Sequence, residues 1–165
     1  MVDAFAHVPV DLNNIMKLQE TLTLDCTFST VKLNSKKRIL ERICAIAVNT
    51  APDLDQKKLL KSILEREKMG STGIGNGIAI PHGRLSNTKK VIAIVLTTEE
   101  AIAFDAIDNR DVDIFIALFV PENSCDEHLQ TLQSIAQLFS DKTFCKRVRK
   151  CLTNEELFEL IQQAN

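Results

Sequence analysis

His82 is the residue of this chain whose surroundings best suit chemistry, because Pro81 precedes it and Gly83 follows it. Pro81 restricts the backbone before the histidine and Gly83 leaves open space after it, so the imidazole is presented rigidly and without obstruction. A neutral imidazole can attack phosphorus, and the N–P bond that forms is labile enough to pass the group onward. A lone histidine is more often structural or solvated, and the glycine-rich loop before His82 is what favours a functional role.

That loop holds all five glycines of the 165-residue chain, between Gly70 and Gly83. Its glycine, serine and threonine residues offer backbone N–H groups and hydroxyls that suit an anion, although a turn that lets two elements pack closely has the same composition. It matches neither nucleotide-binding loop, because G-x-G-x-x-G would need a small residue at Ile78 or Ile80 and no G-K-[ST] occurs. We therefore expect no nucleotide, and we predict that the phosphate loop beside His82 is shaped by Thr72, Gly73, Gly75, Gly77 and Gly83.

His128 is the second candidate, since it lies in the first turn of a predicted helix on one stripe with Leu132, Ile135 and Phe139. The N-terminus of a helix disfavours imidazolium and favours a nearby anion. A neutral His128 could thus donate a hydrogen bond to a phosphoryl group, and a satisfied core histidine is the alternative. His7 lies near the N-terminus and is given no role.

The bulk composition is that of an ordinary soluble globular protein. Twenty Lys and Arg against 22 Asp and Glu give a net charge of −2, and basic residues are interspersed with acidic ones, which weighs against nucleic acid. Neither a signal peptide nor a membrane-spanning stretch is recognisable. The five cysteines are scattered and odd in number, which favours reduced thiols in the cytoplasm over disulfides or a metal site. We expect one domain over residues 1–165, in which residues 1–25 form an N-terminal segment that is less clearly part of the domain, with neither cofactor nor metal.

The hydrophobic pattern predicts the helices that would position these histidines. Leu12, Ile15 and Met16 hint at a short first helix. Ser35 is placed to cap a second helix, and a third runs to Met69, where Gly70 stops it. Capping boxes of the S/T-x-x-E type precede two further helices, at Ser124 with Glu127 and at Thr153 with Glu156, and another helix covers residues 143–152.

Strands are predicted where β-branched and apolar residues gather, at residues 27–33, 78–80, 91–97 and 112–120. The last of these is continuous enough to be buried on both faces, and Pro121 ends it. Helices, strands and helices follow one another along the chain. That order predicts an α/β sandwich with a mixed sheet.

Two segments make the sequence recognisable. Arg66-Glu67-Lys68-Met69 running into the glycine segment, followed by Ile80-Pro81-His82-Gly83, closely resembles enzyme IIA domains of the fructose/mannitol type in the bacterial phosphoenolpyruvate:sugar phosphotransferase system. The stretch 102–109, the strand to Pro121, and Glu127-His128-Leu129 extend the resemblance. Within that family the chain looks most like the nitrogen-regulatory enzyme IIA.

The resemblance implies a role for three residues and a fold. His82 matches the histidine that accepts phosphate on Nε2 from a small histidine phosphocarrier protein of the HPr or NPr type. His128 matches the histidine that supports the phosphoryl group, and Arg66 the arginine that neutralises its charge. The family fold is a mixed β-sheet with helices on both faces, and its chemistry needs neither metal nor nucleotide.

Three functions are compatible with these residues. The leading hypothesis is a cytoplasmic phosphoryl carrier of the nitrogen-type branch, whose phosphorylation state selects partners; in the resembling family these include potassium transporters and sensor kinases. A sugar-transport enzyme IIA that passes phosphate to a separate fructose/mannitol-type permease is the second. A protein-binding module in which His82 is never phosphorylated is the third. No nucleic acid is expected as a partner, and the chain is not expected to be embedded in a membrane.

Overall fold

Two long apolar strands, β5 (Ile92–Ile102) and β6 (Val112–Pro121), pair antiparallel at the centre of the fold. Almost every residue of β6 is buried, as predicted for a strand covered on both faces. β5 is longer than the predicted strand, because threonines and exposed glutamates carry it past a register shift to Ile102. These elements belong to a computed structural model that describes residues 17–86 and 88–164.

The sheet has the strand order β1-β5-β6-β3-β2. β1 (Thr27–Val31) pairs parallel with β5, whereas β3 (Ile78–Ala79) pairs parallel with β6 and antiparallel with β2 (Gly73–Gly75). β4 (His82–Leu85) also pairs parallel with β6. Parallel and antiparallel pairs coexist, so the predicted mixed sheet is confirmed.

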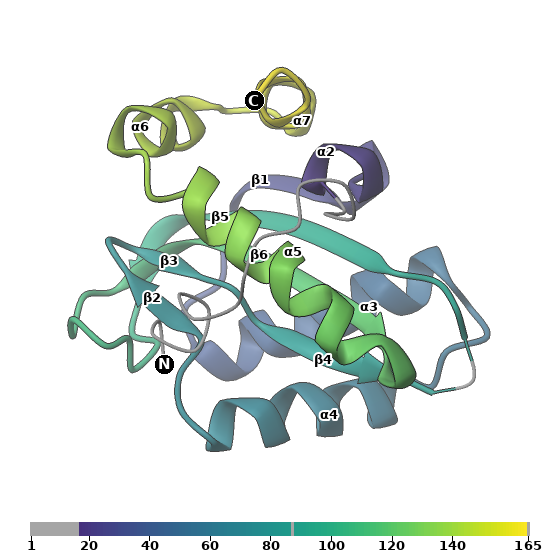
Figure 1. The fold of residues 1–165 in the computed structure, drawn as a ribbon. Helices are drawn as coiled ribbons and strands as arrows, with labels where there is room; N and C mark the ends of the chain where they lie inside the picture. The colour runs from purple at the N-terminus through teal and green to yellow at the C-terminus, as the bar shows by residue number, and fades with distance from the viewer. Residues whose placement is uncertain (1–16, 87, 165) are drawn as a thin grey trace.

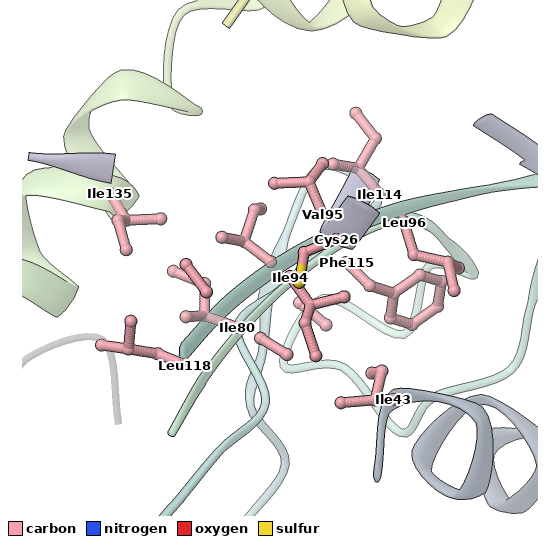
Figure 2. Packing of buried hydrophobic residues seen from close by; sticks show 14 of the residues in the cluster. Cys26, Ile43, Ile80, Ile94, Val95, Leu96, Ile114, Phe115, Leu118 and Ile135 are labelled. Carbon is pink, nitrogen blue, oxygen red and sulfur yellow. The ribbon is translucent and has the colours of Figure 1, made fainter. Parts of the chain in front are cut away.

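Helices cover both faces of this sheet (Figure 1). α3 (Lys36–Thr50) and α4 (Gln56–Lys68) lie on one side, and α5 (Cys125–Leu138) crosses the other. Figure 2 shows Ile43 of α3 and Ile135 of α5 pointing to the central strands from opposite sides. Both side chains are buried, so the core extends through the sheet from one helical layer to the other.

Among the remaining elements, α2 (Leu18–Thr21) lies near β1, and α6 (Lys142–Lys150) and α7 (Asn154–Gln162) lie beyond the C-terminal end of α5 (Figure 1). The short helix η1 (Leu24–Cys26) precedes β1, and η2 (Glu122–Ser124) connects β6 to α5. The backbone N–H of Ser29 donates to Asn154 Oδ1 at 2.8 Å, which fixes α7 beside β1. The predicted helix around Leu12, Ile15 and Met16 lies outside the described residues. In the part of the chain that is described, no helix is both long and apolar enough to span a bilayer.

Two of the three predicted caps form as expected, and one does not. Ser35 Oγ accepts from Arg38 N at 3.2 Å, and Thr153 Oγ1 accepts from Glu156 N at 3.1 Å. Ser124 occupies the N-cap position of α5, but its side chain forms no capping hydrogen bond. Its φ and ψ of −121° and 20° follow from the 3₁₀ turn η2, whereas an effective cap needs an extended backbone.

The glycine segment is not the loop that its composition predicts, because much of it is a β-hairpin. Asn76 and Gly77 connect β2 to β3 with φ values of 58° and 81°. Two central residues with positive φ are what a tight type I′ hairpin turn requires, and Asn-Gly is its preferred sequence.

β3 and β4 keep one register against β6 across the break at Ile80 and Pro81. Ala79 pairs with Phe115, and three residues further along both strands His82 pairs with Leu118. Pro81 has no N–H to contribute, but its carbonyl accepts from Leu118 N at 3.0 Å. The interruption therefore leaves the position of His82 along the sheet unchanged.

Candidate functional site

His82 is the first residue of β4, and α4 covers the free edge of this strand. The Arg84 N–H, which has no neighbouring strand, donates to Ser62 Oγ of α4 at 2.8 Å. A Cβ on Gly83 would lie 3.2 Å from both Ser62 Oγ and the Phe119 ring. Glycine at this position thus allows helix and strand to lie close together, and His82 sits at their junction.

The two neighbours of the His82 ring define its tautomer. Nδ1 lies 3.0 Å from the carbonyl oxygen of Ile80, which can only accept, so Nδ1 carries the proton. Nε2 lies 3.1 Å from Nε of Arg66, which can only donate, so Nε2 presents its lone pair. The ring is therefore a neutral imidazole whose Nε2 is the nucleophilic atom.

Arg66 comes from the last turn of α4, opposite His82. Besides its contact with His82, its NH1 donates to the Gly70 carbonyl at 2.8 Å, immediately beyond the end of the helix. Gly70 has a φ of 141°, and its N–H bonds back to the Glu67 carbonyl at 3.2 Å. This turn holds the guanidinium across the end of the helix and against the imidazole. Burial lowers the pKa of Arg66, and Glu67 partly opposes that change.

The surroundings of His82 keep it neutral. Burial is the largest influence and lowers the pKa of the imidazole, and the positive charges of Arg66 and Arg84 lower it further. The Ile80 carbonyl and the Glu67 carboxylate act in the opposite direction. The net pKa is below the ordinary value of 6.5, so the nucleophilic form predominates near neutral pH.

His128 lies in the first turn of α5, as predicted, and 8% of it is exposed. Burial lowers its pKa too, so its ring is also neutral. Its Nδ1 is buried and has no hydrogen-bond partner among the described residues. Buried polar nitrogens normally have hydrogen-bond partners, so the Nδ1 of His128 is unusual for a histidine packed in a protein core.

One pocket of about 360 Å³ brings together the three candidate residues Arg66, His82 and His128. Its walls come from α4, β4, β6 and the beginning of α5. The other lining residues are Ser62, Glu65, Met69, Gly83, Arg84, Leu118, Val120, Leu129 and Leu132. The lining includes two neutral imidazoles and two arginines against one carboxylate, that of Glu65, so the excess of positive charge suits a small anion.

Of the five residues predicted to shape the phosphate loop, only Gly83 lines this pocket. A Cβ on Gly73 would lie 2.7 Å from Ala106 Cβ, and one on Gly77 would lie 2.6 Å from the guanidinium of Arg149. Gly75, with a φ of 105°, faces Asp108. Thr72 is buried, and its hydroxyl donates to Glu67 Oε1. The structure thus gives these four residues neighbours other than His82.

Three residues of the pocket were not predicted from the sequence, namely Ser62, Leu118 and Arg84. Arg84 lies two residues after His82, and strand alternation would have placed both side chains on one face. Ser62 and Leu118 reach the site only through strand pairing and helix packing, which leave no local pattern. No group of three or more metal-ligating side chains is found in residues 17–86 and 88–164.

The chain matches a known protein family over most of its length. The profile described as "Phosphoenolpyruvate-dependent sugar phosphotransferase system, EIIA 2" matches residues 20–164 of the chain. Among curated proteins, the "Nitrogen regulatory protein" of Klebsiella oxytoca is 44% identical over 156 residues, which cover 94% of this chain and 96% of that protein. The protein of the same name from Escherichia coli is 46% identical over 88% of this chain and 90% of its own length.

Solved structures agree as well. The nitrogen regulatory protein IIA-Ntr of Neisseria meningitidis is similar, with a TM-score of 0.81, 33% identity, and coverage of 87% of this chain and 98% of that one. The mannitol IIA of Escherichia coli shares the fold, with a TM-score of 0.70 at 20% identity over 86% of this chain and 99% of that one.

Proposed function

Since the chain belongs to the type 2 EIIA family of the phosphoenolpyruvate-dependent sugar phosphotransferase system, we propose that it is a phosphoryl carrier whose acceptor is His82. The observation that carries this proposal is the pair of contacts that fix the His82 ring. The Ile80 carbonyl holds the proton on Nδ1, and Arg66 approaches Nε2. A phosphoryl acceptor needs the attacking nitrogen to carry a lone pair instead of a proton, and the Nε2 lone pair, which accepts from Arg66 here, can attack once the guanidinium moves to the phosphoryl oxygens.

His82 gives up no proton when it accepts the phosphoryl group. The hydrogen bond from Arg66 to Nε2 breaks, the Nε2 lone pair attacks the phosphorus of a phosphohistidine donor, the donor N–P bond breaks, and its electron pair returns to the donor nitrogen. His82 keeps its Nδ1 proton, so the phosphorylated ring is cationic and its N–H bonds to the Ile80 carbonyl. Reversal of these steps passes the group onward.

Arg66 and His128 stabilise the phosphoryl group in this proposal. The guanidinium already lies 3.1 Å from the attacking nitrogen, so it is within reach of oxygens bound to a phosphorus on that atom. His128 lines the same pocket as a neutral ring, whose N–H can donate a hydrogen bond to the phosphoryl group. The work of the protein is thus positioning and charge stabilisation.

We propose a small histidine phosphocarrier protein of the HPr or NPr type as the donor. It would dock over the pocket rim, where the apolar side chain of Met69 is 82% exposed. The proposal places the protein in the cytoplasm, where such a carrier resides, and treats residues 1–165 as one domain.

We further propose a regulatory output, in which a phosphate on His82 adds up to two negative charges and changes which protein partner binds. The relatives at 44% and 46% identity are named nitrogen regulatory proteins, whereas a "PTS system fructose-like EIIA component" of Escherichia coli is 28% identical over 86% of this chain. The names of the more similar relatives favour regulation over sugar transport.

Intact mass measurement tests the acceptor. The protein is incubated with phosphoenolpyruvate, enzyme I and the phosphocarrier, and we expect the mass of one acid-labile phosphoryl group to be gained. His82→Ala should gain none, while His7→Ala, which removes another of the three histidines, should gain one as the wild type does. If the wild type gains no mass in the presence of an active carrier, the carrier function is wrong and the protein-binding module is the function that is left.

The output is tested by presenting the phosphorylated protein with a separate fructose-type or mannitol-type IIB domain. A regulator should transfer its phosphate to that domain much more slowly than a sugar-specific IIA does. If the protein transfers its phosphate as fast as the sugar-specific IIA does, sugar transport becomes the better account of its output than regulation.

A further inference from the structure

Glu67, which follows Arg66 in α4, has a buried carboxylate outside the pocket. Its side chain is 5% exposed, and it receives hydrogen bonds from the Thr72 hydroxyl and from Thr72 N, the latter at 3.2 Å. Lys36 of α3 forms an ion pair with it at 2.8 Å. A buried carboxylate with this many partners is fixed in orientation.

Lys36 is itself fixed by the segment that follows β5. Its ammonium lies 4.5 Å from the centre of the Phe104 ring and 3.4 Å from the Phe104 carbonyl oxygen. Ser71 Oγ donates to the same carbonyl at 2.8 Å. Three elements therefore meet at Glu67: α3, the end of α4, and the connection from α4 to β2.

Hydrogen bonds lead from Glu67 to Nδ1 of His82. Thr72 donates to the Glu67 carboxylate, and the Thr72 carbonyl accepts from Ile80 N at 3.0 Å. The Ile80 carbonyl then accepts from His82 Nδ1 at 3.0 Å. On the other side of the ring, Nε2 is contacted by Arg66, the residue adjacent to Glu67 in the helix. Through Thr72, the Glu67 carboxylate is thus linked to the Ile80 carbonyl, which is the partner of Nδ1.

We propose that Glu67 is a positioning residue, which through Thr72 and Ile80 holds the His82 ring in its Nδ1–H tautomer with Nε2 directed at the incoming phosphorus. Its effect on phosphorylation rests on the proposed function, whereas its effect on the tautomer does not. Neither Glu67 nor Thr72 lines the pocket, so each acts through the residues that it holds.

The test uses Glu67→Gln, which keeps an acceptor oxygen for Thr72 but removes the charge that Lys36 binds. Nitrogen NMR of the His82 ring reports the tautomer directly, and we expect a smaller Nδ1–H population than in the wild type. The initial rate of phosphorylation should fall roughly 10- to 100-fold, because small displacements of reacting groups have effects of that order. Glu155→Gln, which neutralises an exposed carboxylate on α7, is the matched control and should match the wild type in both measurements.

A double variant distinguishes positioning from general support of the fold. If Glu67 acts through Thr72, adding Glu67→Gln to Thr72→Val should slow phosphorylation by much less than it slows the wild type. The same fold-change in both backgrounds, or a wild-type tautomer and rate in Glu67→Gln, would overturn the proposal. Should Glu67→Gln fail to fold, Thr72→Val removes only the hydroxyl donor and is expected to shift the tautomer in the same direction; an unchanged tautomer there would equally overturn it.

The two proposals can fail separately. A wild-type protein that accepts no phosphate, combined with a tautomer that shifts in Glu67→Gln, would end the carrier function and keep the positioning role. Normal phosphorylation of the wild type and of Glu67→Gln, combined with an unchanged tautomer, would keep the carrier function and end the positioning role.

Discussion

At the scale of single residues, the chemistry of His82 depends on two neighbours with opposite hydrogen-bonding character. A carbonyl oxygen can only accept and a guanidinium can only donate, so together they assign the proton to Nδ1 and the lone pair to Nε2. His128 and Arg84 complete the pocket around that lone pair. The resemblance of the flanking motifs named Arg66, His82 and His128 and implied Nε2 as the acceptor atom, and the structure adds the two contacts that place the proton on Nδ1.

His128→Ala should leave His82 able to accept a phosphate but should weaken onward transfer. We expect the transfer rate to fall roughly 100-fold, the order seen when one preorganised donor to a developing charge is removed. Rapid-quench measurement of phosphate loss to an acceptor domain tests this. The matched control is Leu152→Ala, which removes an exposed side chain far along the sequence from α5. Unchanged transfer kinetics in His128→Ala would leave His128 with a packing role only.

The pH dependence of His82 follows from the causes of its lowered pKa. The groups that face it are Arg66, Glu67 and Arg84, with the Ile80 carbonyl, and burial outweighs them all. Because the pKa is below 6.5, protonation should begin only in more acidic solution than for an exposed histidine. An NMR titration of the ring should therefore have its midpoint below 6.5, and the midpoint should rise in Arg66→Ala, since the arginine lowers the pKa. A midpoint at or above 6.5 in the wild type would contradict the lowering of the His82 pKa by burial.

At the scale of elements, the site depends on the hairpin and the strand break that follow α4. Asn76 and Gly77 return the chain antiparallel, and β3 and β4 then follow β6 in one register up to His82. Arg149 clamps the turn: it donates to the Asn76 carbonyl at 2.8 Å and forms an ion pair with Asp113 at 2.9 Å. The glycines at positions 75 and 77 thus serve the turn that brings the strand to β6.

Gly77→Ala tests this use of glycine. The φ of 81° strains any residue with a Cβ, and the new Cβ would lie 2.6 Å from Arg149 and 3.0 Å from Asp113. We expect the free energy of unfolding to fall by about 1–3 kcal/mol, measured by urea denaturation. Asn76→Gly, in the same turn, should change it by less than about 0.5 kcal/mol, because glycine adopts a φ of 58° freely. Equal stability of both variants would show that the turn tolerates side chains.

Periodicity was a good guide to the elements with strong local patterns and a poor guide to the glycine segment. α3, α4, β6 and α7 lie close to their predicted positions, because each carries an apolar face or run that the core buries. β2 and β4 were not predicted, since short glycine-containing strands have no hydrophobic alternation and exist only through pairing with neighbours. The Asn76-Gly77 pair was the one local signal of the hairpin.

At the scale of the whole molecule, the site lies at one edge of a sheet whose centre is closed on both faces. β5 and β6 bury apolar side chains toward α3 on one side and toward α5 on the other (Figure 2). His82 lies at the edge, where α4 and the start of α5 leave a pocket open. The core that provides stability and the site proposed for phosphoryl transfer therefore lie in different parts of the same sheet.

Ile94→Ala should lower the stability of the protein without slowing the phosphorylation of His82. Ile94 is fully buried in β5, does not line the pocket, and pairs with Ala117 of β6. Its truncation leaves a cavity in a close-packed core, which should cost about 2–5 kcal/mol of unfolding free energy. Ile107→Ala, at a position that is 64% exposed, should cost less than about 0.5 kcal/mol. At temperatures where Ile94→Ala remains folded, His82 should accept phosphate at nearly the wild-type rate. A rate that falls in proportion to stability would mean that the edge pocket depends on packing at the centre of the sheet.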